Sequence, residues 1–244
     1  MPLLYRALTL VVATGYNGRM TAVNKRMMSV AIDGPAGAGK STVARLVAAA
    51  LGCIYVDTGA MYRAVAWAVL DAGIAPDDAE GVCALAERID TRLDRERVFV
   101  GETEVTDKIR TPEISNLTSP ISALPCVRTR LAALQREMGR RGGVVMEGRD
   151  IGTVVLPDAE IKVFLTASLA ERVRRRREEL GEAGIALSTA QLEADISARD
   201  ARDASRDVAP MVPARDAILL QSDGLDIAQV VSCILEYCKA KANR

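Results

Sequence analysis

Residues 34–41 carry the spacing that a phosphate-binding loop requires. Gly34, Gly39, Lys40 and Ser41 fill the pattern G-x-x-x-x-G-K-[ST], in which glycine backbone wraps closely around a phosphate because no Cβ obstructs it. Free N–H groups at the start of the following helix favour negative charge. In such a loop the lysine reaches the β- and γ-phosphates and the serine hydroxyl holds Mg²⁺. The pattern predicts binding of a nucleoside triphosphate, the alternative being a glycine-rich turn that matches by chance.

The segments on either side of this loop favour the first interpretation. Residues 30–32 form an apolar run typical of a buried strand, and residues 42–51 are expected to form a helix that Gly52 ends. A strand before the loop and a helix after it are the context in which the pattern is specific. The candidate phosphate-binding residues are Gly34, Pro35, Ala36, Gly37, Ala38, Gly39, Lys40, Ser41 and Thr42.

Two further groups of charged residues are expected beside this loop, because each follows a predicted strand. Arg63 lies one turn into the helix after strand 53–57, and residues 147–150 (Glu-Gly-Arg-Asp) follow the apolar strand 143–146. In a parallel sheet the carboxyl ends of the strands form one rim, where ligands bind. Arg63 is then an anchor for a second, phosphate-bearing substrate, or else a surface arginine. The charges at 147–150 are expected to be paired, in a site, in a structural ion pair, or in both.

An arginine-rich helix is predicted at 168–180. Such a run is usually a solvated helix face and sometimes a nucleic-acid patch, but no aromatic residues lie among the arginines to stack bases. Gly181 and Gly184 are expected to break this helix before a second charged helix at 188–206. The two helices would form a hinged hairpin that closes over phosphates and keeps water from competing as an acceptor.

The elements that must position these residues alternate between strands and helices. Strands are expected at 30–32, 53–57, 143–146, 161–165 and 217–220, and further helices at 58–72, 77–89, 127–140 and 227–240. This alternation predicts an α/β fold, with a parallel sheet covered by helices on both faces. The stretch 91–109 does not fit: residues 98–106 resemble a short hairpin, so we interpret the stretch as an insertion.

The amino-acid composition excludes several classes of function. The chain has 244 residues, of which 49% are apolar, enough for one large α/β domain with mobile parts. Basic and acidic residues number 32 each, so no net charge draws the molecule toward nucleic acid or a membrane. There is no histidine, which excludes histidine acid–base catalysis and histidine metal sites. Phosphoryl transfer remains, because it relies on positioning and charge neutralisation.

The cysteines and the first residues bear on the compartment. The five cysteines form no C-x-x-C pair, so they are expected to be small core residues of a reducing compartment rather than ligands or disulfides. Residues 1–28 only faintly resemble a signal peptide, and no stretch is long enough to cross a membrane. We expect a disordered extension or an over-long gene start there, and a cytoplasmic protein.

Five motifs together resemble the family of bacterial cytidylate kinases. They lie at 34–41, 57–63 (Asp-Thr-Gly-Ala-Met-Tyr-Arg), 147–155, 199–203 (Arg-Asp-Ala-Arg-Asp) and 208–213. Their order and spacing extend the resemblance from about residue 29 to the C-terminus. It implies a P-loop nucleoside-monophosphate-kinase fold with a five-stranded parallel core, an acceptor region enlarged by a small antiparallel sheet, and a short helical lid. The implied division is a core of 29–57, 141–170 and 208–244, an acceptor region of 58–140 and a lid of 171–207.

The resemblance also implies an activity and its substrates. The γ-phosphoryl group of ATP would pass to CMP or dCMP, with Mg²⁺ held by Ser41 and the ATP phosphates, and with Lys40 and Arg199 as catalytic residues. The family precedent is a monomer, and no nucleic-acid or membrane partner is implied. The implied CMP-binding residues are Thr58, Tyr62, Arg63, Ser119, Arg128, Glu147, Arg149, Asp150, Arg199, Asp203 and Arg206.

Individual roles follow from matching positions. Arginines 63, 149 and 206 match those that hold the acceptor phosphate, and Arg199 falls on a further lid arginine. Asp203 matches the carboxylate that reads the sugar hydroxyl. Ser119, Arg128 and Asp150 match the positions that read the cytosine edge, where an N4 amino donor lies beside N3 and O2 acceptors.

Some points stay open on the sequence alone. Thr58 stands where some members have Ser, and Glu147 where some have Asp, which moves the carboxylate by one methylene. The sequence does not rank CMP, dCMP and UMP as acceptors. It also does not show which of the arginines at 172–177 would contact ATP. A P-loop kinase for another small acceptor, and a nucleotide-dependent switch or RNA-binding regulator, are the alternative functions.

Overall fold

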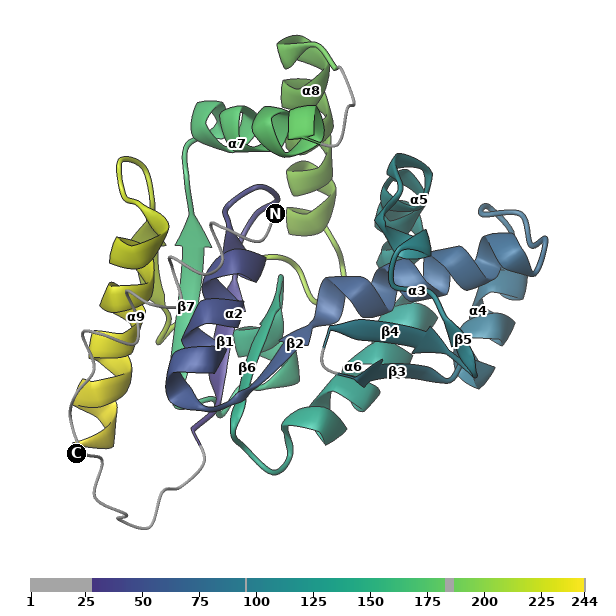
Figure 1. The fold of residues 1–244 in the computed structure, drawn as a ribbon. Coiled ribbons are helices and arrows are strands. Elements are labelled where there is room, and N and C mark those ends of the chain that lie inside the picture. Colours follow the sequence, from purple (N-terminus) through teal and green to yellow (C-terminus); the bar gives the residue numbers. More distant parts are fainter. Residues whose placement is uncertain (1–27, 95, 183–186, 244) are drawn as a thin grey trace.

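The computed structural model describes residues 28–94, 96–182 and 187–243. Its centre is a five-stranded sheet in the order β2-β6-β1-β7-β8, and every neighbouring pair is parallel. The five-stranded parallel core is therefore confirmed (Figure 1). The strands are β1 (Val30–Asp33), β2 (Ile54–Asp57), β6 (Val144–Gly148), β7 (Ile161–Thr166) and β8 (Ile218–Gln221).

Successive residues of β1 and β6 pack against different layers, because side chains alternate across a strand. Val30 and Val145 contact α2 (Lys40–Leu51) and α9 (Ile227–Ala242). Ala31 and Met146 contact α6 (Pro125–Gly139) and the short π-helix η2 (Ile151–Val155), which the sequence pattern did not predict. Burial on both faces explains why these strands are continuous apolar runs rather than alternating ones.

A second hydrophobic core lies in the acceptor region, built from α3 (Thr58–Asp71), α4 (Ala79–Arg88), α5 (Pro112–Ala123) and α6. The insertion is a three-stranded antiparallel sheet of β3 (Thr91–Asp94), β4 (Arg97–Val100) and β5 (Thr103–Glu104), followed by η1 (Lys108–Arg110). The predicted hairpin corresponds to β4 and β5. The sequence of β3 mixes polar and apolar residues and does not predict a strand. The segment is extended because it pairs with β4.

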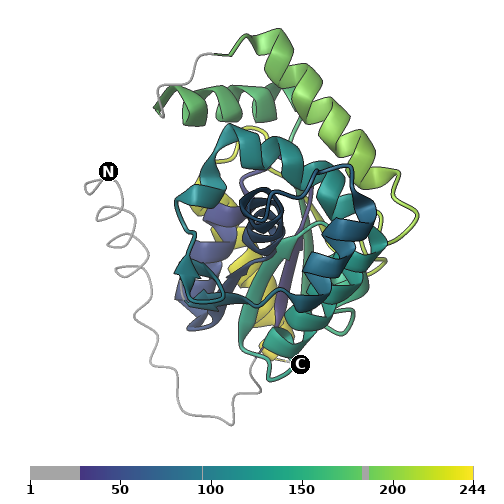
Figure 2. The same cartoon turned by 90° about the vertical axis from the view of Figure 1, so that its right-hand side faces the viewer.

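The region predicted to be a lid contains a pair of helices, α7 (Leu169–Glu182) and α8 (Thr189–Ala204), at the same end of the sheet as the loop between β1 and α2 (Figures 1 and 2). Val173 and Leu180 of α7 pack against Leu192 and Ile196 of α8. The prediction that Gly181 breaks the first helix is wrong, since α7 continues through it to Glu182. A glycine costs a helix only about 1 kcal/mol. Gly184 lies outside the described residues, as do residues 1–27.

One expectation about the cysteines is wrong. Cys83 on α4 and Cys126 at the start of α6 form a disulfide, with their Cα atoms 5.6 Å apart. Their separation of 43 residues matches no short cysteine motif, and only the packing of α4 against α6 brings them together. Within the described part of the chain, no helix is long and apolar enough to span a bilayer.

Candidate functional site

The loop between β1 and α2 has a backbone that only glycine allows. Gly34 has a φ of 145°, and a Cβ there would lie 2.0 Å from the carbonyl oxygen of Leu165 on β7. Gly39 has a φ of 85° and caps the N-terminus of α2. Lys40 is buried, and its Nζ donates a hydrogen bond of 2.7 Å to the carbonyl of Pro35. The loop thus closes around its own lysine and directs N–H groups of α2 toward the rim.

Positive charge is concentrated around Lys40. Burial, and next the charge of Arg149, lowers the pKa of Lys40 from 10.5 to about 7, with Arg199 adding to the effect. Burial and Arg149 likewise lower the pKa of Arg199 to about 10, and Arg63 contributes. Cations from the phosphate loop, α3, the end of β6 and α8 therefore lie close enough to influence one another electrostatically. Such a cluster attracts a polyanion, because each cation raises the cost of keeping the others charged.

Glu147 lies in β6 itself and is buried beside the phosphate loop. Tyr55 of β2 donates a hydrogen bond of 3.1 Å to its Oε1. Burial and the charge of Asp57 raise the pKa of Glu147, while Lys40 and a hydrogen bond with the Ser41 side chain oppose the rise. A serine hydroxyl beside a carboxylate offers the hard oxygen ligands that suit Mg²⁺.

The segment after β6 is held from two sides. Asp33, buried at the end of β1, accepts hydrogen bonds of 2.8 Å from the backbone N–H groups of both Ile151 and Gly152. Burial raises the pKa of Asp33 to about 6. Thr58 donates a hydrogen bond of 2.7 Å to the carbonyl of Glu147. These anchors fix the backbone that carries Arg149 and Asp150.

The residues predicted to read a base come together on the acceptor side. Arg128 of α6 forms a buried ion pair of 2.6 Å with Asp150, and its guanidinium lies 5.5 Å from the centre of the Tyr62 ring. Arg128 also contacts the carbonyl of Ser122, whose hydroxyl bonds to the carbonyl of Ser119. Among the described residues, the buried Oγ of Ser119 has no hydrogen-bond partner. This hydroxyl can therefore bond to a ligand.

Asp203 joins two predicted phosphate arginines. Its carboxylate accepts a hydrogen bond of 2.9 Å from Arg149 and pairs with Arg206. Burial alone would raise the pKa of Asp203, but the arginines outweigh it and hold the pKa below its ordinary value. Arg206, just beyond α8, also reaches the hydroxyl of Ser122 on α5. Arg63 is paired separately with Asp57, at 2.9 Å.

Two lid arginines that sequence reasoning did not single out contact the phosphate loop. Arg172 donates to the carbonyl of Ala36 at 3.1 Å and pairs with Asp200, which accepts from the N–H of Ala36. Arg175 donates to the carbonyl of Ala38 at 3.3 Å and to the hydroxyl of Ser222 at 3.1 Å. Their spacing of three residues places both on one helix face, but Arg174 and Arg177 have the same spacing, so no local signal separated them from the rest of the run.

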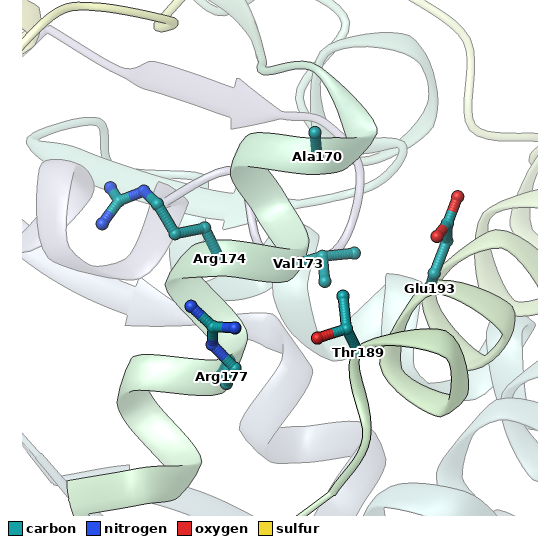
Figure 3. Close-up of a pocket in the computed structure, with 6 residues that line it drawn as sticks. All are labelled: Ala170, Val173, Arg174, Arg177, Thr189 and Glu193. Carbon is teal, nitrogen blue, oxygen red and sulfur yellow. The ribbon is translucent and has the colours of Figure 1, made fainter.

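Other arginines of α7 form ion pairs within that helix. Arg174 pairs with Glu171 and Glu178, and Arg176 pairs with Glu179, all on α7. A pocket of about 290 Å³ lies between α7 and α8. It is lined by Ala170, Val173, Arg174, Arg177, Thr189 and Glu193, with Val173 and Thr189 between the two helices (Figure 3). None of the predicted site residues lines it, so it is not the candidate active site.

Comparison with known proteins gives consistent matches. A protein-family model described as cytidylate kinase matches residues 30–240. A cytidylate kinase of Desulfitobacterium hafniense is 51% identical over 220 residues, covering 89% of this chain and 95% of that protein. A bifunctional pantoate ligase/cytidylate kinase of Nostoc sp. is 48% identical over 232 residues. That match covers 92% of this chain, which spans only 43% of the bifunctional protein.

Solved structures are more distant. Shikimate kinase from Acinetobacter baumannii, in complex with shikimate, matches with a TM-score of 0.44 and 17% identity, over 88% of this chain and 94% of that one. This likeness is too low to support an inference.

Proposed function

The chain belongs to the cytidylate kinase family, and from that premise we propose that it transfers the γ-phosphoryl group of ATP to CMP or dCMP, giving ADP and CDP or dCDP. One observation carries the proposal beyond family membership. The buried phosphate-loop lysine, Lys40, lies within electrostatic reach of the half-buried Arg149 and Arg199. A donor phosphate on the loop and an acceptor phosphate on the arginines would then lie next to each other.

The reaction is a direct in-line displacement. An oxygen of the CMP phosphate attacks the γ-phosphorus, and the bond to the ADP oxygen breaks. Arg63, Arg149 and Arg206 hold the acceptor phosphate so that its oxygen is in line. Lys40 and Arg199 stabilise the negative charge on the transferred group. No covalent enzyme intermediate is needed.

A magnesium ion fits the donor set at the start of α2. The hydroxyl of Ser41 and the carboxylate of Glu147 would hold it together with the ATP phosphates. When bound, Mg²⁺ would neutralise negative charge on the ATP phosphates. Tyr55 keeps the Glu147 carboxylate oriented through its 3.1 Å hydrogen bond.

Base choice rests on the pair of Arg128 and Asp150. A carboxylate accepts from the N4 amino group of cytosine, and a guanidinium donates to N3 or O2. The hydroxyl of Ser119 is a further partner for the base edge. Asp203, held by Arg149, would accept a hydrogen bond from a sugar hydroxyl. Uracil carries a carbonyl at position 4, so that acceptor oxygen would face the acceptor oxygens of Asp150, which disfavours UMP.

The lid completes the donor side. Arg172 and Arg175 bridge α7 to the phosphate loop, so the lid is anchored where ATP would bind and shields the reacting groups from water. The proposal also includes the remaining expectations: the three-part division of the chain given above, and a monomeric cytoplasmic enzyme with no nucleic-acid or membrane partner.

The decisive experiment measures ADP formation with CMP, dCMP, UMP, AMP, GMP and shikimate as separate acceptors. Strong turnover with CMP and dCMP alone supports both the reaction and the base-reading residues. Turnover with a different acceptor keeps the kinase and discards the base-reading assignments. Folded protein that binds ATP but shows no acceptor-stimulated turnover would favour a nucleotide-dependent switch.

A further inference from the structure

The Cys83–Cys126 disulfide lies behind the base-reading residues. Cys126 is in the first turn of α6, two residues before Arg128. Cys83 is in the middle of α4, which leads into the inserted sheet. The bond closes a ring of chain that contains β3, β4, β5 and all of α5. It therefore joins α4 to the corner where α5 meets α6.

That corner carries the acceptor contacts. Leu124 alone separates α5 from α6, so the two helices shift together. Ser119 and Ser122 lie on α5, and Ser122 contacts both Arg128 and Arg206. If this corner becomes less rigid, the positions of both Arg128, in the base-reading pair, and Arg206, a predicted phosphate arginine, are affected.

The helices remain packed without the bond. Val82 and Ala86 of α4 share a buried apolar cluster with Val127 and Leu131 of α6. Both cysteines are only partly buried, so neither is enclosed in the hydrophobic core. Breaking the bond is thus expected to loosen the corner rather than unfold it, which is what a reversible device requires.

We propose that Cys83 and Cys126 form a redox-modification site, at which a dithiol reductant opens the disulfide and weakens CMP binding while leaving ATP binding unchanged. The inference rests on the proposed function. Disulfides in reducing compartments are usually transient and redox-sensing, which fits a bond that links a substrate-binding corner.

Thiol–disulfide exchange between the dithiol and the Cys83–Cys126 bond needs no further oxidant or reductant. A thiolate of the dithiol attacks Sγ of Cys83, and the Cys83–Cys126 bond breaks with its electron pair on Cys126. The N-terminal N–H groups of α6 stabilise the Cys126 thiolate, which makes it the better leaving group. The second thiol of the reductant then displaces Cys83. The enzyme gains two thiols, and the reductant becomes a cyclic disulfide.

The test uses the full chain, purified without reductant, with dithiothreitol as the probe. Alkylation with iodoacetamide followed by peptide mass analysis reports the state of Cys83 and Cys126. KM for CMP and KM for ATP are measured before reduction, after it, and after reoxidation. We expect KM for CMP to rise roughly fivefold on reduction, within the range of coupling between linked sites. It should return on reoxidation, with KM for ATP constant.

Variants separate this role from simple stabilisation. The double variant Cys83→Ser/Cys126→Ser should show the raised KM for CMP and no response to dithiothreitol. Cys233→Ser on α9 is the matched control and should respond as the wild type does. If both cysteines are alkylated before reduction, no disulfide is present and the inference is wrong. An unchanged KM for CMP after complete reduction also contradicts it. Neither outcome contradicts the proposed function. No turnover with CMP in either state overturns the proposed function and this inference with it.

Discussion

The phosphate loop is one continuous run of the chain, whereas the acceptor side is assembled from α3, α5, α6, the end of β6 and the segment after α8. The loop is shaped by backbone: Gly34 and Gly39 adopt positive φ, and Lys40 bonds to the carbonyl of Pro35. The acceptor side is shaped by ion pairs between elements, such as Arg128–Asp150 and Arg149–Asp203.

This difference has a consequence for substitutions. A backbone cradle keeps its shape when an acceptor side chain changes, because nothing on the acceptor side defines its φ and ψ angles. An ion pair between two buried partners fails when either is lost, because the other charge is left without compensation. We therefore expect effects on ATP and on CMP to separate. The following changes test that separation, from the largest effect to the smallest.

Lys40→Ala should have the largest effect. Removing the charge that stabilises the transferred group is expected to lower kcat by about 10²–10³, as for the loss of other transition-state donors. CMP affinity, measured by calorimetry, should stay nearly unchanged. Lys241→Ala on α9 is the control and should behave as the wild type. Equal losses of turnover and CMP affinity would contradict the expectation that the ATP and CMP sites can be disturbed separately.

Asp150→Ala should act on CMP instead. It leaves Arg128 buried without its 2.6 Å partner, and truncation of such a pair costs about 2–5 kcal/mol. KM for CMP should rise at least tenfold, KM for ATP should not change, and the preference for CMP over AMP should relax. Asp94→Ala removes one of the two acidic partners of the exposed Arg97 and should change neither constant, because exposed pairs contribute little. An unchanged CMP-to-AMP preference in Asp150→Ala would remove Asp150 from base reading.

Binding of ATP, rather than of CMP, should be accompanied by proton uptake at Lys40. In the protein without ATP, Lys40 has a pKa of about 7. ATP phosphates beside it would raise that pKa, because an opposite charge favours the charged form. Binding of ATP at pH 8 should therefore take up a proton, and ATP affinity should fall as the pH rises above 7. Calorimetry in buffers of different ionisation enthalpy measures the uptake. Lys40→Met should abolish it, and uptake that survives this change would assign the proton to another group.

The lid arginines should give the smallest effect. Arg175→Ala removes the hydrogen bonds to Ala38 and Ser222 and should raise KM for ATP by roughly threefold to tenfold, at about 1 kcal/mol for a net hydrogen bond. Arg174→Ala, one position away, loses only pairs within α7 and should leave KM for ATP unchanged. Equal effects of the two variants would mean that the lid acts through total charge rather than through contact with the loop.

Much of the fold could be predicted because its signals are local. The core strands, the strand–loop–helix unit around Gly34 and the cap at Gly52 each depend on a few consecutive residues, and the structure confirms these elements. The resemblance to the family is confirmed as well. The roles assigned to individual site residues stay predictions, which the variants above test. Local signals failed at Gly181, an exposed glycine that α7 tolerates because one glycine costs a helix only about 1 kcal/mol, and at β3, which pairs with β4.

The sequence by itself therefore determined the phosphate-loop pattern, the order of the five core strands, and the family, because each depends on neighbouring residues and their periodicity. Only the tertiary structure decided which charges pair, that Arg172 and Arg175 are the arginines of α7 that contact the loop, and that Cys83 meets Cys126. The bonds from Asp33 to Ile151 and Gly152 span 118 and 119 residues. Contacts over such separations are set by the packing of whole elements, which no local pattern contains.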